Sequence, residues 1–125
     1  SEVCAYLQQR RIEAFINVRC DAFLLGLANA REEAERRAEA YEAAGADGLF
    51  FPCVTRTEDI ESLVAKTRLP VNVMTLPELP DFKVLSDLGV KRISSGNFGH
   101  VAIYSQLEQQ LTDVKQTGSC APLFS

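Results

Sequence analysis

Residues 14–23 read AFINVRCDAF, and this stretch decides the fold that the sequence predicts. It opens with a short apolar run and continues through three polar residues, Asn17, Arg19 and Asp21. A short apolar run is typical of a strand that is buried on both faces, as in a parallel sheet. We therefore expect a strand over residues 15–18. Its polar side chains would then lie at the carboxyl end, where α/β folds bind their ligands.

The rest of the chain repeats this pattern of helix and apolar strand. Further strands are expected over residues 48–51, 71–74 and 90–94, and helices over residues 2–14, 30–44, 58–66, 82–88 and 100–115. Strands that alternate with helices predict a parallel sheet with right-handed crossovers. The sequence therefore predicts an α/β fold with four parallel strands in a single domain, residues 1–125, whose residues 117–125 form a C-terminal tail.

Helix boundaries are indicated by short polar residues and glycines. Asn29, Thr57 and Asp81 are expected to cap the helices that follow them, because a side-chain oxygen there can accept a free backbone N–H. Gly45 and Gly89 are expected to end helices in the left-handed conformation.

Composition limits the classes of protein. The chain has 125 residues, with 46% hydrophobic residues, 24% charged residues and a net charge of −4, and it contains no basic cluster. These values argue against nucleic acid as a partner, and no apolar run reaches the length of a membrane span. The cysteines show no CxxC spacing, which argues against zinc and favours reduced thiols in a cytoplasmic protein. They are Cys4, Cys20, Cys53 and Cys120.

Four ordered segments resemble the isocitrate lyase/phosphoenolpyruvate mutase superfamily. They are INVRCDAFLLG (16–26), YEAAGADGLFFPCV (41–54), LPVNVMTLPELP (69–80) and LGVKRISSGN (88–97). The resemblance implies strands five to eight, the C-terminal half, of a (β/α)8 TIM-type barrel. The family's first four strands, which carry the Mg²⁺ ligands and the lyases' catalytic loop, have no counterpart here. We therefore expect no catalytic residue, metal ligand or cofactor in this chain, and Mg²⁺ only in the intact family fold.

The same resemblance implies roles for three residues. Arg19 matches the strand-five arginine that binds a substrate carboxylate, and a guanidinium offers paired donors that suit this group. Asn72 matches a strand-seven asparagine that helps to bind a carboxylate, and Asp21 would hold the loop or orient Arg19. From the residues themselves, Ser94 and Gly96 could cradle an anion on free N–H groups before the last helix.

Each of these residues also has a structural interpretation. Arg19 and Asp21 could form a surface salt bridge, and Asn72 could satisfy backbone groups of a loop. Ser94 and Gly96 could serve only to cap the final helix.

The remaining chemical candidates carry less information. Cys20 and Cys53 could form a redox or nucleophilic pair, but small buried hydrophobic residues are the default interpretation. Pro52 or Cys53 stands where several catalytic relatives have a glutamate, and this departure argues against lyase chemistry. We interpret His100 as a surface residue at a helix start rather than a general base.

These features favour one function and leave two alternatives. The favoured interpretation is a non-catalytic or incomplete half-barrel with a vestigial carboxylate-binding face. It would self-associate through its sheet edges and its C-terminal helix. The alternative is the C-terminal half of an enzyme that makes or breaks a C–C or P–C bond in a small 2-oxo or dicarboxylic acid. An open sheet of the flavodoxin type has little support, because no glycine-rich phosphate loop follows the first strand.

Overall fold

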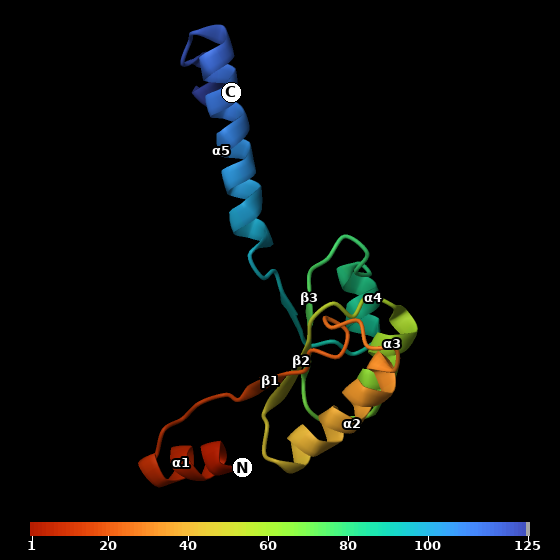
Figure 1. Ribbon diagram of the computed structural model, residues 1–125. Helices are drawn as coiled ribbons and strands as arrows, with labels where there is room; N and C mark the ends of the chain where they lie inside the picture. Colours follow the sequence, from red (N-terminus) through yellow and green to blue (C-terminus); the bar gives the residue numbers. More distant parts are fainter. Residues whose placement is uncertain (125) are drawn as a thin grey trace. The chain divides into compact units, whose positions relative to one another are not determined.

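The computed structural model describes residues 1–124 and divides the chain into two compact units, Ser1–Ser94 and Ser95–Ser125. The first unit holds a sheet of four parallel strands in the order β1-β2-β3-β4. The strands are β1 (Asn17–Arg19), β2 (Gly48–Phe51), β3 (Val71–Met74) and β4 (Arg92–Ser94), and the helices of this unit are α1 (Glu2–Arg10), α2 (Ala30–Ala43), α3 (Thr57–Ala65) and α4 (Phe82–Asp87). The predicted α/β architecture is therefore confirmed (Figure 1).

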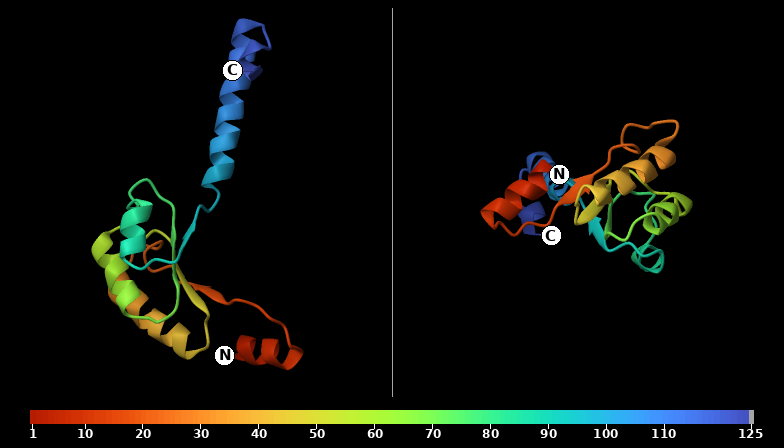
Figure 2. Two further views of the ribbon diagram at one scale, coloured as in Figure 1. Left: turned by 180° about the vertical axis from the view of Figure 1, so that it is seen from behind. Right: turned by 90° about the horizontal axis from the view of Figure 1, so that it is seen from below.

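One face of the sheet packs against α2, α3 and α4, as Figures 1 and 2 show. Alternate strand residues project to this first face, and the helices supply small and branched side chains opposite them. The core that results consists mainly of Leu49, Phe51, Val71 and Val73 from the strands and Ala34, Ala38, Ile60, Leu63 and Leu85 from the helices. Burial of these side chains is the main force that holds the helices to the sheet.

The second face of the sheet carries the other alternate residues. Paired residues of parallel strands project to the same face, so the register assigns this set directly. It consists of Asn17, Arg19, Gly48, Phe50, Asn72, Met74, Arg92 and Ser94. Phe50 and Met74 lie outside the hydrophobic core, which agrees with their place on this face.

The two inner strands match the predicted ranges, whereas the two edge strands are displaced. β1 covers Asn17–Arg19 rather than residues 15–18, and β4 covers Arg92–Ser94 rather than residues 90–94. The prediction that the first strand is buried on both faces is wrong. Arg19 is exposed and Val18 is only half-buried, because β1 is an edge strand and its second face carries no packed helix.

The predicted helix starts are correct in part. Asp81 caps α4, since its Oδ1 accepts the backbone N–H of Val84 at 3.0 Å. Asn29 occupies the N-cap position of α2, but its side chain makes no capping hydrogen bond. Thr57 is the first residue of α3, and the extended Arg56 precedes it as the N-cap residue.

The helix ends follow backbone conformation. α1 ends at Arg10 rather than at residue 14, because Arg11 adopts the left-handed conformation with φ 54°. Gly45 and Gly89 follow α2 and α4 with φ of 90° and 93°, which confirms both as left-handed helix ends.

The second unit consists of α5 (Phe98–Thr117) followed by a short 3₁₀ helix, η1 (Ala121–Phe124). The helix is longer at both ends than the predicted range 100–115, and Gly118 ends it with φ 64°. The predicted tail, residues 117–125, thus contains a helical turn, and Ser125 lies outside the described residues. Within residues 1–124, no helix combines the length and the apolar character that a membrane crossing requires.

Candidate functional site

The parallel strands direct their carboxyl ends to one edge of the sheet in the first unit. Arg19 is the last residue of β1, Asp21 follows it, and Ser94 is the last residue of β4. Asn72 lies within β3. The sequence thus places its candidate ligand-binding groups on three strands, and the contacts between them define the site.

Arg19 and Asp21 form the first cluster. The Nε of Arg19 donates to Oδ1 of Asp21 at 2.5 Å, and the side chains are 52% and 39% exposed. This hydrogen bond and the charge of Asp21 raise the pKa of Arg19, so the guanidinium stays charged at any working pH. No other group of the described chain bonds the guanidinium, which leaves its two terminal nitrogens free for a ligand.

Asn72 and Ser94 form the second cluster. The Nδ2 of Asn72 lies 3.0 Å from the Ser94 hydroxyl, and that hydroxyl lies 3.1 Å from Oδ1 of Asn72. The hydroxyl can therefore accept from the amide nitrogen or donate to the amide oxygen. Asn72 is only 3% exposed, and its bonding partner is a side chain on the neighbouring strand rather than a loop backbone group.

The two clusters share the second face of the sheet but do not touch. Arg19 pairs in register with Phe50, and Phe50 pairs with Asn72. Two strand spacings therefore separate Arg19 from Asn72, about 10 Å along the sheet. The aromatic ring of Phe50 projects from the strand between them. The face therefore carries the charged Arg19 group on one side of this apolar ring and the polar Asn72–Ser94 pair on the other.

Two other predicted residues belong to the second unit. Gly96 has φ 57° in the turn before α5, and its role in ligand binding stays a prediction. His100 is exposed in the first turn of α5, where its ring lies 4.3 Å from that of Tyr104, centre to centre. This position agrees with its interpretation as a surface residue at a helix start.

The described cysteines are all free. Cys20 is 1% exposed and belongs to the core, as expected of a small buried hydrophobic residue. Cys53 is half-buried after β2 and adopts φ 65°, a conformation that L residues other than glycine seldom take. Asp21 is the main cause of the raised Arg19 pKa, and Cys53 adds a smaller electrostatic contribution. The sequence had no signal for this left-handed residue.

A metal site requires several ligands at one place. Among residues 1–124, no group of three or more His, Cys, Asp or Glu side chains could hold an ion. Asp21, the carboxylate beside Arg19, is engaged by that arginine. Mg²⁺ binding by the intact family fold, whose ligands the resemblance places on strands without a counterpart here, stays a prediction.

The fold and the site together define a class, which is a set of consecutive βα units from a TIM-type barrel with a charged arginine at a strand end. Comparison with known proteins identifies the family within this class. The phosphoenolpyruvate phosphomutase family matches residues 1–115, and the chain belongs to this family.

Solved structures support the assignment. A Burkholderia cenocepacia protein, provisionally named a phosphonomutase, is 34% identical with a TM-score of 0.76, over 86% of this chain and 46% of its own. A second protein of that organism, provisionally named a lyase/mutase, is 27% identical with a TM-score of 0.78, over 89% of this chain and 40% of its own. The fold is therefore that of part of a larger α/β barrel.

Curated relatives show the same partial coverage. An uncharacterized protein of Mycobacterium tuberculosis is 33% identical over 96 residues, which are 77% of this chain and 37% of that protein. An oxaloacetate decarboxylase of a Bradyrhizobium species is 34% identical over 95 residues, which are 73% of this chain and 31% of that enzyme. The chain thus spans less than half the length of these relatives.

Proposed function

We propose that the carboxyl end of this sheet binds a small carboxylate ligand, with Arg19 as its anchor. The observation that carries the proposal is the state of the Arg19 guanidinium, which is charged, half-exposed and held at Nε by Asp21. A guanidinium fixed at one edge presents its terminal N–H groups in a defined direction, and this geometry suits the two oxygens of a carboxylate.

Asp21 acts as the positioning residue in this proposal. Its carboxylate accepts the Nε hydrogen of Arg19 and so fixes the plane of the guanidinium. Asn72 and Ser94 offer further hydrogen-bonding groups on the same face, two and three strands away. They would contact the part of the ligand that lies beyond Phe50.

We further propose that the chain is one part of a barrel that other strands complete. β1 and β4 form the two edges of the described sheet, and unpaired edges recruit further strands. A second copy of the chain could supply these strands, with α5 contributing to the contact. In this form the face binds carboxylates without catalysing a reaction.

The alternative is that the chain contributes this face to an enzyme. It is favoured by the similarity to oxaloacetate decarboxylases, whose named reaction breaks a C–C bond in a 2-oxo dicarboxylic acid. Arg19 would then bind the carboxylate of a substrate whose C–C or P–C bond is made or broken. Because the described residues do not form a metal site, we assign no catalytic step to them.

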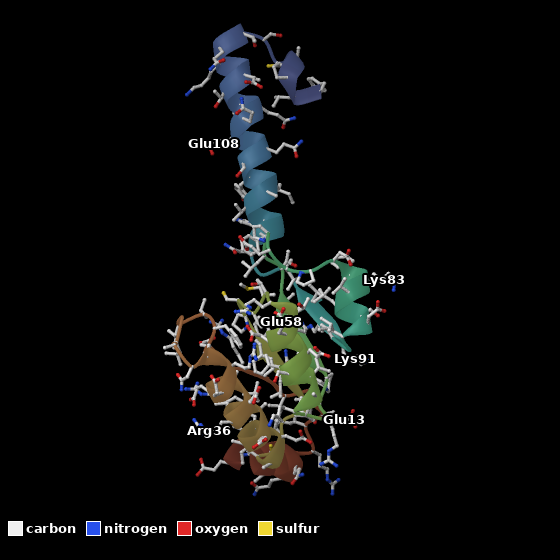
Figure 3. All side chains as sticks on the ribbon, turned by 90° about the vertical axis from the view of Figure 1, so that its right-hand side faces the viewer. Glu13, Arg36, Glu58, Lys83, Lys91 and Glu108 are labelled. Carbon is white, nitrogen blue, oxygen red and sulfur yellow. The ribbon has the colours of Figure 1, made fainter. Side chains whose placement is uncertain are left out.

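Titration calorimetry with oxalate, which mimics the enolate of a 2-oxo acid, tests the proposal. The wild-type chain, Arg19→Ala and the control Arg36→Ala are titrated with and without Mg²⁺. Arg36 is a suitable control because it lies on α2 (Figure 3) rather than on a strand, and its partner Glu33 keeps its bond to Arg37.

Binding that is lost only in Arg19→Ala supports the proposal. If that binding also requires Mg²⁺, the enzymatic alternative is favoured over the simple carboxylate-binding face. Absence of binding by the wild-type chain under both conditions, or equal binding by Arg19→Ala, overturns the proposed function.

A further inference from the structure

Arg92 is an unpaired cation on the same face as the candidate site. It is the first residue of β4 and is exposed, and no hydrogen bond or ion pair engages its side chain in the described part of the chain. Among the described residues of the first unit, Arg10 and Arg11 likewise form no ion pair, whereas six other arginines pair with carboxylates; they are Arg19, Arg31, Arg36, Arg37, Arg56 and Arg68. All the N–H donors of the Arg92 guanidinium can therefore bind a ligand.

The register gives Arg92 polar neighbours. It pairs directly with Asn72 on β3, and Ser94 follows two residues later on the same strand and the same face. The Asn72 amide uses one contact on the Ser94 hydroxyl, and an amide nitrogen carries two hydrogens. A charged donor beside an amide and a hydroxyl is a combination that binds carboxylates.

Arg19 and Arg92 lie at the two ends of one row across the sheet. The row runs Arg19, Phe50, Asn72, Arg92, and all four side chains project to the second face. Three strand spacings separate the two arginine backbones, about 14 Å along the sheet. Arg19 ends β1 whereas Arg92 begins β4, and each arginine side chain is long enough to reach along the row toward a ligand that lies over Phe50 and Asn72.

We propose that Arg92 is a specificity-determining residue of this site, which binds the second acidic group of a dicarboxylate whose first carboxylate is held by Arg19. The inference rests on the proposed function and adds to it. With Arg19 alone, the face would bind mono- and dicarboxylates with similar affinity. With Arg92 at the other end of the row, a bound monocarboxylate leaves the Arg92 guanidinium without an acidic partner. The site therefore binds the dicarboxylate more tightly.

The test compares two ligands that differ in one carboxylate. 2-Oxopentanoate and 2-oxoglutarate have the same chain length and the same 2-oxo acid group, and only 2-oxoglutarate has a second acidic end. Their affinities are measured by calorimetry on the full chain for the wild type, Arg92→Met, Arg92→Lys and the control Lys91→Met. Lys91, labelled in Figure 3, is also exposed and carries the same charge, but strand alternation directs it away from the second face.

The wild type is expected to prefer 2-oxoglutarate by roughly tenfold, since one charge-assisted contact distinguishes the two ligands. Arg92→Met should remove this preference while leaving 2-oxopentanoate binding unchanged, Arg92→Lys should restore part of it, and Lys91→Met should retain it. Equal affinity of the wild type for both ligands, or an unchanged preference in Arg92→Met, overturns the role of Arg92 and leaves the role of Arg19 intact. Failure of the wild type to bind either ligand overturns the proposed function as well.

Discussion

At the level of one residue, Arg19 forms an ion pair that contributes little to stability but matters for ligand binding. Its ion pair with Asp21 is half-exposed, and exposed pairs contribute about 0–1 kcal/mol to stability. Removing Asp21 should therefore change the folding free energy little. The consequence for binding is larger, because the pair fixes the orientation of the guanidinium and leaves its terminal nitrogens for a ligand.

The structure predicts an acid-dependent contribution to stability from Glu33. Hydrogen bonds from Arg36 and Arg37 lower the pKa of Glu33 from 4.5 to about 2. Because the folded-state pKa lies below the ordinary value, this contribution is complete above about pH 4.5 and is lost as the pH falls toward about 2. Glu33→Gln should thus lower the free energy of unfolding at neutral pH and have progressively less effect in acid.

Urea unfolding of the wild type and Glu33→Gln across this pH range measures the difference. Glu39→Gln, a change on the same helix, serves as the control. A difference between wild type and Glu33→Gln that stays constant from pH 7 to pH 2 would contradict the assigned cause.

The sequence predicted some contacts of the site and could not predict others. Arg19 and Asp21 are two residues apart, so their contact follows from local chain geometry. Asn72 and Ser94 lie 22 residues apart on different strands, and their bond depends on the register of β3 and β4, which residue types alone do not define. Cys53 takes its left-handed conformation without glycine, asparagine or aspartate at the position, so no local signal marks it.

At the level of elements, α4 depends on its cap. This helix has six residues, and Asp81 bonds the backbone N–H of Val84. Asp81→Ala should lower the free energy of unfolding by about 1 kcal/mol, because it leaves an unsatisfied N–H at the start of the helix that holds Leu85 in the core. The measurement is urea unfolding.

Asp87→Ala is the matched control for this prediction. Asp87 is the last residue of the same helix, and its exposed bond to Lys83 contributes little. If the two substitutions have equal effects, the cap does not determine the stability of α4.

The accuracy of the predicted elements follows their position in the sheet. The ranges of β2 and β3 were predicted correctly, because each is a short, mainly apolar run that begins or ends at glycine or proline and is flanked by a strand on both sides. β1 and β4 each pair with only one neighbouring strand. Each is three residues long, which is shorter than the predicted ranges 15–18 and 90–94. Local composition marks an edge strand less sharply than an inner one.

At the level of the whole molecule, α5 presents an apolar stripe. Tyr104, Leu107 and Leu111 recur at helical spacing and are 59%, 43% and 48% exposed within the described chain. We predict self-association that uses this helix, since a stripe of this kind is stable when another surface covers it. Light scattering on a sizing column should give a mass of twice 13.8 kDa or a higher even multiple.

Leu107→Glu should shift this mass toward the monomer without unfolding the sheet, whereas the exposed change Gln106→Glu on the same helix should not. A monomeric wild-type chain would contradict self-association. An unchanged mass in Leu107→Glu would exclude α5 from the contact.

The whole-molecule architecture was predictable because strands and helices alternate along the chain, and this alternation requires parallel strands. The division of the chain into two compact units between Ser94 and Ser95 could not be predicted in this way. Helical periodicity over α5 has the same form whether a helix packs on a sheet or on another surface, so the periodicity does not predict where this helix packs.

The measurement that tests the central claim most directly is a calorimetric titration of the wild-type chain and Arg19→Lys with oxalate. Lysine keeps the positive charge but replaces the paired guanidinium donors with a single ammonium group. The account predicts that Arg19→Lys binds at least about tenfold more weakly, because a carboxylate loses one of two directed hydrogen bonds. Equal affinity of the two proteins would show that charge alone attracts the ligand, and it would contradict the claim that the oriented Arg19 guanidinium forms the carboxylate site.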